Sequence, residues 1–229
     1  MQPRVITIDG PAGSGKSTAA RRLAKALGFT YLNTGALYRA VTHVALNGGI
    51  DIDDPAKVDL VANVARTINF QYVLKNDQSR FMVNGHDSTE ALFTAELTGR
   101  LKPVVNNNVV RAALVAKMRA AVEAVIAQGA KGVVMEGRDI GTVVFPNALI
   151  KFYIHADIHE RTRRRVTELL ARGEPVDSKG IQAQIEKRDE TDKGREIGAL
   201  IRAADAIDVD TTHLDEETTL QFLLKKMTL

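Results

Sequence analysis

The sequence predicts an α/β protein whose core is a five-stranded parallel sheet with helices on both faces. Short apolar runs of strand length recur along the chain, and helical patterns separate most of them, which is typical of this class. Glycine-rich or charged motifs follow several of these runs. Because ligands of such sheets bind at the carboxyl ends of the strands, those motifs are the candidate functional sites. The expected strands are residues 5–9, 30–33, 132–136, 149–155 and 206–210.

The first expected strand leads into the sequence GPAGSGKST and then into a helical pattern. Gly10 and Gly15 can adopt backbone angles that residues with a Cβ avoid, so the chain can fold closely around a ligand. With Lys16 and Ser17 the stretch matches G-x-x-x-x-G-K-[ST], in which backbone N–H groups, the lysine and the hydroxyl hold the phosphates and Mg²⁺ of a nucleoside triphosphate. The phosphates would lie at a helix N-terminus, which favours anions. The alternative is a glycine-rich turn that binds no ligand.

The second expected strand is followed by the sequence NTGALYR. A helix that begins at Thr34 would place Thr34 and Tyr38 on one face, with Arg39 next to them at the end of the strand. An arginine there can bind a second phosphate group in bidentate fashion. The alternative, which is the commoner explanation for such a motif in isolation, is an ordinary helix cap beside a surface arginine.

Two regions between the second and third strands have patterns of their own. The sequences INFQYVL and SRFMVNG alternate apolar and polar residues on either side of the turn-prone KNDQ, which predicts an antiparallel hairpin within residues 68–84. This hairpin breaks the α/β alternation and therefore indicates an insert. Residues 104–128 carry apolar side chains at spacings of three and four, which predicts one long helix packed against a core.

Three charged residues, Glu136, Arg138 and Asp139, lie at the end of the third expected strand. Charges at a strand end are costly to bury unless they pair with one another or with a ligand, so a salt-bridge cluster and a ligand site are both open. The neighbouring glycines Gly137 and Gly141 allow close approach of the backbone and favour the ligand.

The candidate residues for a metal ion are two carboxylates and two histidines. Asp9 and Glu136 end their strands, where they could order the water ligands of Mg²⁺ or instead brace Lys16 and neighbouring arginines. His155 and His159 are four apart, but the first ends a strand and the second starts a helix, so we do not expect them to bind a metal together.

The part of the chain after the fourth expected strand is rich in arginine and contains eight of the eighteen arginines. One helix would carry Arg161, and a second helix would present Arg188, Asp192 and Arg195 on one face, because they are spaced four and three apart. Surface ion pairing is the usual reason for such spacing. A mobile arginine-rich segment that closes over nucleotides would also neutralise a transferred phosphoryl group and exclude water. The turn-rich sequence ARGEPVDSKG, residues 171–180, is the expected hinge.

Composition limits the classes of function. Hydrophobic residues make up 45% of the 229 residues and charged residues 26%, which is ordinary for a globular protein. No apolar run approaches the roughly 18 residues of a membrane span, and no export signal is visible, so we expect a cytoplasmic protein without a membrane partner. The absence of cysteine excludes disulfides and thiol chemistry. The net charge is only +3 and acids are interleaved with the arginines, which argues against nucleic acid as a partner.

Together these motifs resemble those of the bacterial cytidylate kinases, which belong to the nucleoside monophosphate (NMP) kinase group of P-loop kinases. The matching pieces are ITIDGPAGSGKST, LNTGALYR, VNGHD, GRDIGTVVFP and KRDETDKGR, in the family's order over essentially the whole chain. The resemblance implies transfer of the γ-phosphoryl group of ATP to CMP or dCMP, giving ADP and CDP or dCDP, in pyrimidine nucleotide metabolism. It also implies Mg²⁺ as the cofactor bound with ATP, and the two nucleotides as the partners of a chain that we expect to be a monomer.

The resemblance further implies how a single P-loop kinase domain, residues 1–229, is divided. The core would comprise about residues 1–33, 130–160 and 200–229. An NMP-binding subdomain that contains the β insert would span about residues 34–129, and a helical lid about residues 161–199.

The resemblance also implies the functional residues, motif by motif. The implied catalytic residues are Lys16, Arg138, Arg188 and Arg195. The implied ATP-binding residues are Gly10, Pro11, Ala12, Gly13, Ser14, Gly15, Lys16, Ser17, Thr18 and Arg161, with Ser17 near Mg²⁺. The implied CMP-binding residues are Thr34, Tyr38, Arg39, Lys102, Arg111, Arg138, Asp139, Arg188, Asp192 and Arg195.

Four positions depart from the pattern of the family. Lys102 stands where a serine is common, and Phe93 where an arginine is common. Asn33 and Thr34 stand where aspartate and serine occur in relatives. Because these residues fall in the region implied to bind the acceptor, another monophosphate such as UMP is the alternative acceptor. A regulatory P-loop ATP-binding module is the alternative from another class of protein.

Overall fold

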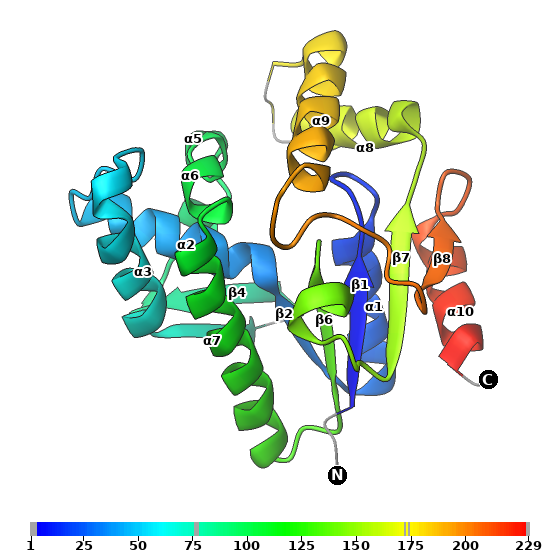
Figure 1. The fold of residues 1–229 in the computed structure, drawn as a ribbon. Helices are drawn as coiled ribbons and strands as arrows, with labels where there is room; N and C mark the ends of the chain where they lie inside the picture. Colours follow the sequence, from blue (N-terminus) through cyan, green and yellow to red (C-terminus); the bar gives the residue numbers. More distant parts are fainter. Residues whose placement is uncertain (1–3, 76–77, 172, 174, 228–229) are drawn as a thin grey trace. The chain divides into compact units, whose positions relative to one another are not determined.

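The computed structural model describes residues 4–75, 78–171, 173 and 175–227 (Figure 1). It divides the chain into two compact units. The first unit comprises residues 1–31 and 125–229, and the second comprises residues 32–124.

The five strands of the parallel sheet lie in the order β2-β6-β1-β7-β8. Their bounds are β1 Val5–Asp9, β2 Thr30–Asn33, β6 Val133–Gly137, β7 Ile150–His155 and β8 Ile207–Asp210. β1 pairs in parallel with β6 and β7, and β7 pairs in parallel with β8. Every residue of β1 is buried, which is typical of a central strand in a parallel sheet. The predicted sheet is confirmed, although β6, β7 and β8 each begin one residue later than expected.

The helices of the first unit follow the strands as the alternation predicts (Figure 1). Their bounds are α1 Lys16–Leu27, α8 Ile158–Ala171, α9 Ser178–Lys193 and α10 Glu216–Met227. In α1 the buried residues recur on one face, and this face packs against β6 and β1. Two residues of the expected hinge, 172 and 174, lie outside the described residues.

A π-helical turn at Ile140–Val144, labelled η2, was not expected from the sequence. Asp9 at the end of β1 accepts hydrogen bonds from the backbone N–H groups of Ile140 (2.9 Å) and Gly141 (2.7 Å). Burial raises the pKa of the Asp9 carboxyl to about 6, against the opposite effect of these two donors. Asp9 therefore holds the backbone of this turn.

The turn leaves no room for a side chain at Gly141. A Cβ there would lie 2.8 Å from Thr7 Oγ1 and 3.3 Å from Asp9 Oδ2. We expect Gly141→Ala to lower the free energy of unfolding by about 1–3 kcal/mol, because an added methyl group in a filled site strains its neighbours. Urea denaturation would measure the loss. Gly99→Ala is the matched control, since a Cβ at helical Gly99 meets no atom within 4 Å; equal stabilities of both variants and the parent would contradict the prediction.

The second unit contains a three-stranded antiparallel sheet in the order β3-β4-β5. Its strands are β3 Phe70–Lys75, β4 Gln78–Val83 and β5 His86–Asp87. The predicted hairpin is confirmed by the pairing of β3 with β4. The expected turn KNDQ is shorter than predicted because its first and last residues belong to the strands, and its two middle residues, Asn76 and Asp77, lie outside the described residues.

The helices of the second unit include one break that the sequence analysis missed. Their bounds are α2 Thr34–Asn47, η1 Pro55–Lys57, α3 Val58–Thr67, α4 Thr89–Leu92, α5 Ala95–Gly99, α6 Lys102–Val105 and α7 Asn108–Ala127. The prediction of one helix over residues 104–128 is wrong at its beginning. The Asn107 side chain accepts hydrogen bonds from the N–H groups of Val109 and Val110 (both 3.0 Å), so it caps the start of α7 and separates it from α6.

Candidate active site

The loop between β1 and α1 is held by close backbone packing. A Cβ on Gly10 would lie 1.9 Å from the carbonyl oxygen of Ile154, so only glycine fits there. Gly15, the residue before α1, has a φ of 85°, which favours glycine. Ser14 is fully buried, and its carbonyl accepts a hydrogen bond from the Thr211 hydroxyl (3.0 Å). The loop therefore enters the N-terminus of a helix, whose first N–H groups have no partner within the helix.

Lys16, the first residue of α1, is only 8% exposed. Its Nζ donates a hydrogen bond to the carbonyl oxygen of Pro11 (3.0 Å) in the same loop. Burial, with a smaller effect from the charge of Arg138, lowers the pKa of Lys16 to about 7 against the opposing effect of Glu136. An anion that reaches this amino group would restore the preference of Lys16 for the charged form.

Ser17 and Tyr31 both donate hydrogen bonds to Glu136, one to each oxygen of the carboxylate. The Ser17 hydroxyl donates to Oε2 (2.7 Å), and the Tyr31 hydroxyl donates to Oε1 (2.6 Å). Glu136 is 3% exposed and Tyr31 6%. They lie on the neighbouring strands β6 and β2, while Ser17 lies in the first turn of α1. Three elements of the fold are thus joined at a single carboxylate.

Arg138 and Arg195 both pair with the buried carboxylate of Asp192. The Nε of Arg138 donates to Oδ2 (2.6 Å), and Arg195 donates to Oδ1. Burial alone would raise the pKa of Asp192, but the charges of Arg138 and Arg195 lower it overall, so the carboxylate stays ionised. Arg188 is exposed on α9 and its charge acts on the same carboxylate. Asp139 is buried directly before the η2 turn.

The arrangement of Arg188, Asp192 and Arg195 differs from the single helical face that was predicted. α9 ends at Lys193, so Arg195 lies outside the helix. The N–H group of Leu200 donates to the Asp192 carbonyl (2.8 Å), which folds the following segment back on the last turn of α9. Arg195 therefore reaches Asp192 from this segment, and spacing along a helix is not the reason that they meet.

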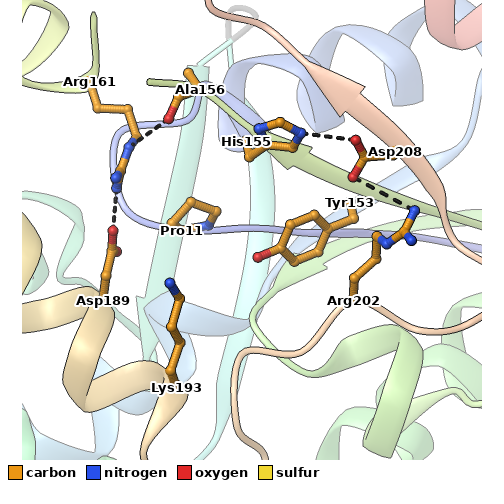
Figure 2. A pocket seen from close by; sticks show the side chains of 9 residues that line it. All are labelled: Pro11, Tyr153, His155, Ala156, Arg161, Asp189, Lys193, Arg202 and Asp208. Atoms are coloured by element: carbon orange, nitrogen blue, oxygen red, sulfur yellow. Dashed lines mark hydrogen bonds and ion pairs between the residues drawn. The ribbon is translucent and has the colours of Figure 1, made fainter. Parts of the chain in front are cut away.

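Arg161 lies beside the phosphate-loop backbone, in the first turn of α8. Its guanidinium group donates to the carbonyl oxygens of Ala156 (3.0 Å) and Ala12 (3.2 Å), and it forms an ion pair with Asp189 of α9. Figure 2 shows Ala156, Arg161 and Asp189 at the edge of a cavity, whose volume is about 330 Å³. The other side chains that line the cavity are Pro11, Tyr153, His155, Lys193, Arg202 and Asp208. Arg161, which lies on α8, thus connects the loop to α9.

The expected residues of the second unit gather around α2. Thr34 is the first, buried residue of this helix, and the Asn33 side chain caps it by accepting a hydrogen bond from the N–H group of Ala36 (3.0 Å). An aspartate can make the same cap, so Asn33 is a mild departure from the family pattern. Arg111 is buried with its guanidinium 5.8 Å from the centre of the Tyr38 ring.

Arg39 is held from three sides within the second unit. It donates hydrogen bonds to the Leu92 carbonyl (3.0 Å) and the Thr98 hydroxyl (2.7 Å), and it lies over the Phe93 ring at 5.0 Å. Phe93 therefore supplies a cation–π contact to Arg39. Lys102 begins α6 and is exposed. The guanidinium of Arg39 is thus oriented by its own unit, contrary to the simple surface arginine considered as the alternative.

Three residues of the first unit were missed as site candidates. Tyr31 binds Glu136, Asp189 binds Arg161, and Thr211 binds the carbonyl of Ser14. A tyrosine near the end of an expected buried strand is a signal that could have been used, because a buried phenol needs a polar partner. Asp189 and Thr211 have no comparable local signal.

The residues that could hold a metal ion are few. Within residues 4–75, 78–171, 173 and 175–227, no three histidine or carboxylate side chains form a group that could bind a metal by themselves. His155 pairs with Asp208 (3.0 Å). The Ser17 hydroxyl and the Glu136 carboxylate offer oxygen donors of the kind that Mg²⁺ takes, usually together with waters and phosphate oxygens.

No helix in the described part of the chain combines the length and the apolar composition that a membrane span requires.

The comparisons with known proteins agree over nearly the whole chain. The family model described as cytidylate kinase matches residues 6–229. The cytidylate kinase of Geobacillus kaustophilus is 40% identical over 226 residues, which cover 98% of this chain and 97% of that protein. The cytidylate kinase of Enterococcus faecalis is 44% identical over 213 residues, which cover 93% and 90% of the two chains. A solved structure of an uncharacterized protein from Eubacterium ventriosum, 15% identical over 99% of each chain, has a TM-score of 0.51 and shows a similar fold alone.

Proposed function

Because the chain belongs to the cytidylate kinase family, it transfers a phosphoryl group from ATP to CMP or dCMP, and we propose that the residues described above divide this work between donor and acceptor. The observation that carries the division is the buried Lys16 at the N-terminus of α1, next to the Ser17–Glu136 pair. Lys16 and the helix N-terminus are suited to phosphates, and the Ser17 and Glu136 oxygens are suited to the metal ion bound with them. The arginines of the chain are suited to a second anion.

The donor side is the loop between β1 and α1. Its backbone N–H groups and Lys16 would bind the ATP phosphates. Arg161, which lies on α8, would also bind ATP. The residues assigned to ATP are Gly10, Pro11, Ala12, Gly13, Ser14, Gly15, Lys16, Ser17, Thr18 and Arg161. Lys16 would contact both the donor phosphates and the transferred phosphoryl group, where its positive charge would neutralise the oxygens on which negative charge accumulates.

The acceptor side is built from arginines and from residues around α2. The residues assigned to CMP are Thr34, Tyr38, Arg39, Lys102, Arg111, Arg138, Asp139, Arg188, Asp192 and Arg195. Arg39, Arg138 and Arg188 would bind the CMP phosphate, and Asp192 its ribose. Asp192 is supported in this role because its ionised carboxylate is already held in place by two arginines. Positioning of two phosphates in line is the main catalytic contribution in this chemistry.

Mg²⁺ fits the donor side of the proposed site. Ser17 and Glu136 would hold it, directly or through water, because both offer oxygen atoms. When bound, the ion would supply positive charge to the phosphate oxygens on which negative charge develops. The protein's own part is to keep the Ser17 hydroxyl and the Glu136 carboxylate oriented before ATP arrives.

The proposed organisation is a core with an NMP-binding subdomain and a closing lid. The core would comprise about residues 1–33, 130–160 and 200–229, the NMP-binding subdomain about 34–129 and the lid about 161–199. The four arginines of α8 and Arg188 of α9 support the lid, because a closing segment must supply positive charge to the transferred group. We place the enzyme in the cytoplasm, where ATP and nucleoside monophosphates are available, and as a monomer.

A coupled assay of ADP release tests the function directly. The protein is incubated with ATP, Mg²⁺ and, in turn, CMP, dCMP, UMP and AMP. We expect fast ADP release with CMP or dCMP and at least about tenfold lower kcat/KM with UMP, because a base site rejects groups that leave its polar atoms unpaired. Faster turnover with UMP would assign a different acceptor. ATP binding without any release that depends on an acceptor would favour a regulatory module.

A further inference from the structure

A chain of hydrogen bonds runs from the edge strand β2, through Glu136 of β6, to the start of α1. The Tyr31 hydroxyl donates to Glu136 Oε1 at 2.6 Å, and the Ser17 hydroxyl donates to Glu136 Oε2 at 2.7 Å. Tyr31 and Glu136 are both almost fully buried. The backbone beside them is fixed as well, because Thr30 N–H donates to the Gly132 carbonyl at 2.9 Å. The carboxylate therefore has a defined donor on each oxygen.

This arrangement determines where the lone pairs of the Ser17 oxygen point. A serine hydroxyl has one proton and two lone pairs, and Ser17 gives its proton to Glu136. Its lone pairs then remain for a further partner, and a hard cation takes such oxygens. The orientation depends on the plane of the Glu136 carboxylate, whose terminal torsion is intrinsically broad. A second donor on the other oxygen, the Tyr31 phenol, restricts that rotation.

We propose that Tyr31 is a positioning residue for the metal ion bound with ATP. Tyr31 does not touch the ion or the nucleotide; it fixes the Glu136 carboxylate, which in turn fixes the Ser17 hydroxyl. The inference rests on the proposed function, because it assumes that Ser17 and Glu136 form the metal side of the ATP site. Side chains that hydrogen-bond to metal ligands in this way orient the ligands and contribute to metal affinity.

The test compares ATP affinity with and without metal. Isothermal titration calorimetry would give the Kd of Mg·ATP, and the Kd of ATP in the presence of EDTA, both without an acceptor. The Kd of metal-free ATP divided by the Kd of Mg·ATP gives the factor by which the metal strengthens ATP binding. In Tyr31→Phe we expect this ratio to shrink about tenfold, while the Kd of metal-free ATP stays within about twofold of the parent, because only a hydroxyl remote from the phosphates is lost.

Tyr72→Phe is the matched control, since it removes a phenol hydroxyl from the antiparallel sheet of the second unit. It should leave both constants unchanged. A double-mutant cycle with Glu136→Gln adds a second readout. Tyr31 acts through Glu136, so Tyr31→Phe should have little further effect on the ratio when Glu136 is already replaced.

Each outcome separates the positioning role from the proposed function. If Tyr31→Phe lowers the melting temperature and leaves the ratio of the parent intact, Tyr31 only fills the core and the inference is overturned. Equal losses for Mg·ATP and metal-free ATP would also overturn it, since they indicate damage to the loop. If the parent protein itself binds ATP equally with and without Mg²⁺, the metal side of the proposed function fails first, whatever Tyr31 does.

Discussion

Replacement of Lys16 by alanine is expected to lower kcat about 100- to 1,000-fold. The amino group lies at the N-terminus of α1, buried and bonded to the Pro11 carbonyl until a stronger partner arrives. Its charge would act on oxygens whose negative charge grows in the transition state, so its loss should affect kcat more than the KM for CMP. The coupled assay of ADP release measures both constants.

The matched control is Lys25→Ala, which removes an exposed lysine from the last turn of the same helix. That variant should keep kcat within about twofold, because an exposed charge contributes little. Urea denaturation of both variants would show whether the fold is retained. A folded Lys16→Ala protein with near-normal turnover would contradict the assignment of the phosphate loop.

The pH dependence of ATP binding gives a second readout of the same group. Burial lowers the pKa of Lys16 to about 7 in the free protein, and a neighbouring phosphate favours the ammonium and raises this pKa. Binding at pH 8 should therefore take up more protons than binding at pH 6, where the lysine is already charged. Calorimetry in two buffers with different ionisation enthalpies would measure the uptake. In Lys16→Ala the part of the difference in proton uptake between pH 8 and pH 6 that comes from this lysine should vanish.

Replacement of Arg138 by alanine is expected to lower kcat/KM for CMP by at least about 100-fold. The change removes a proposed phosphate ligand and one of the two cations that pair with the buried Asp192 carboxylate. Asp192 keeps Arg195 as a partner but loses one charge-assisted hydrogen bond, so we expect the free energy of unfolding to fall by about 2 kcal/mol. Steady-state kinetics with varied CMP and urea denaturation measure the two effects.

Arg138→Lys separates charge from geometry, because lysine keeps the charge and lacks the planar pair of donors. Compared with Arg138→Ala, the Arg138→Lys variant should regain most of the lost free energy of unfolding but only a small part of the lost kcat/KM for CMP. Arg22→Ala is the matched control, because it removes an arginine whose ion pairs, with Glu216 and Glu217, are exposed. It should change stability and kcat/KM little. Unchanged KM for CMP in Arg138→Ala would move Arg138 out of the acceptor site and leave it a structural role.

The sequence predicted best where the local residue types were decisive. The alternation of strands and helices along the chain, the hairpin and the phosphate loop depend on glycines, apolar periodicity and short motifs, each of which lies within a short stretch of sequence. The prediction of one helix over residues 104–128 was wrong for a related reason. The spacing of the apolar residues is helical on both sides of Asn106 and Asn107, but the Asn107 side chain caps a new helix there. Periodicity alone does not detect such a break.

The pairings within the candidate site were beyond the sequence because they join distant residues. Ser17 and Glu136 are 119 positions apart, and Tyr31 meets Glu136 only when β2 lies next to β6. The η2 turn depends in the same way on a carboxylate from β1. Arg195 was expected to lie on a helix, but it reaches Asp192 from the segment after α9. In each case tertiary structure, and not local propensity, selects the partner.

The discontinuity of the first unit has a consequence for the order of events on the ribosome. Residues 1–31 leave the exit tunnel first, but the neighbours of β1 are β6 and β7, which are translated only after residues 32–124. The second unit is continuous, so its contacts can form while the ribosome is still adding residues at about 5–20 per second. The nascent β1 must wait with its apolar side chains uncovered through this interval. Chaperone binding to the emerging N-terminal segment should therefore be strongest before β6 is made.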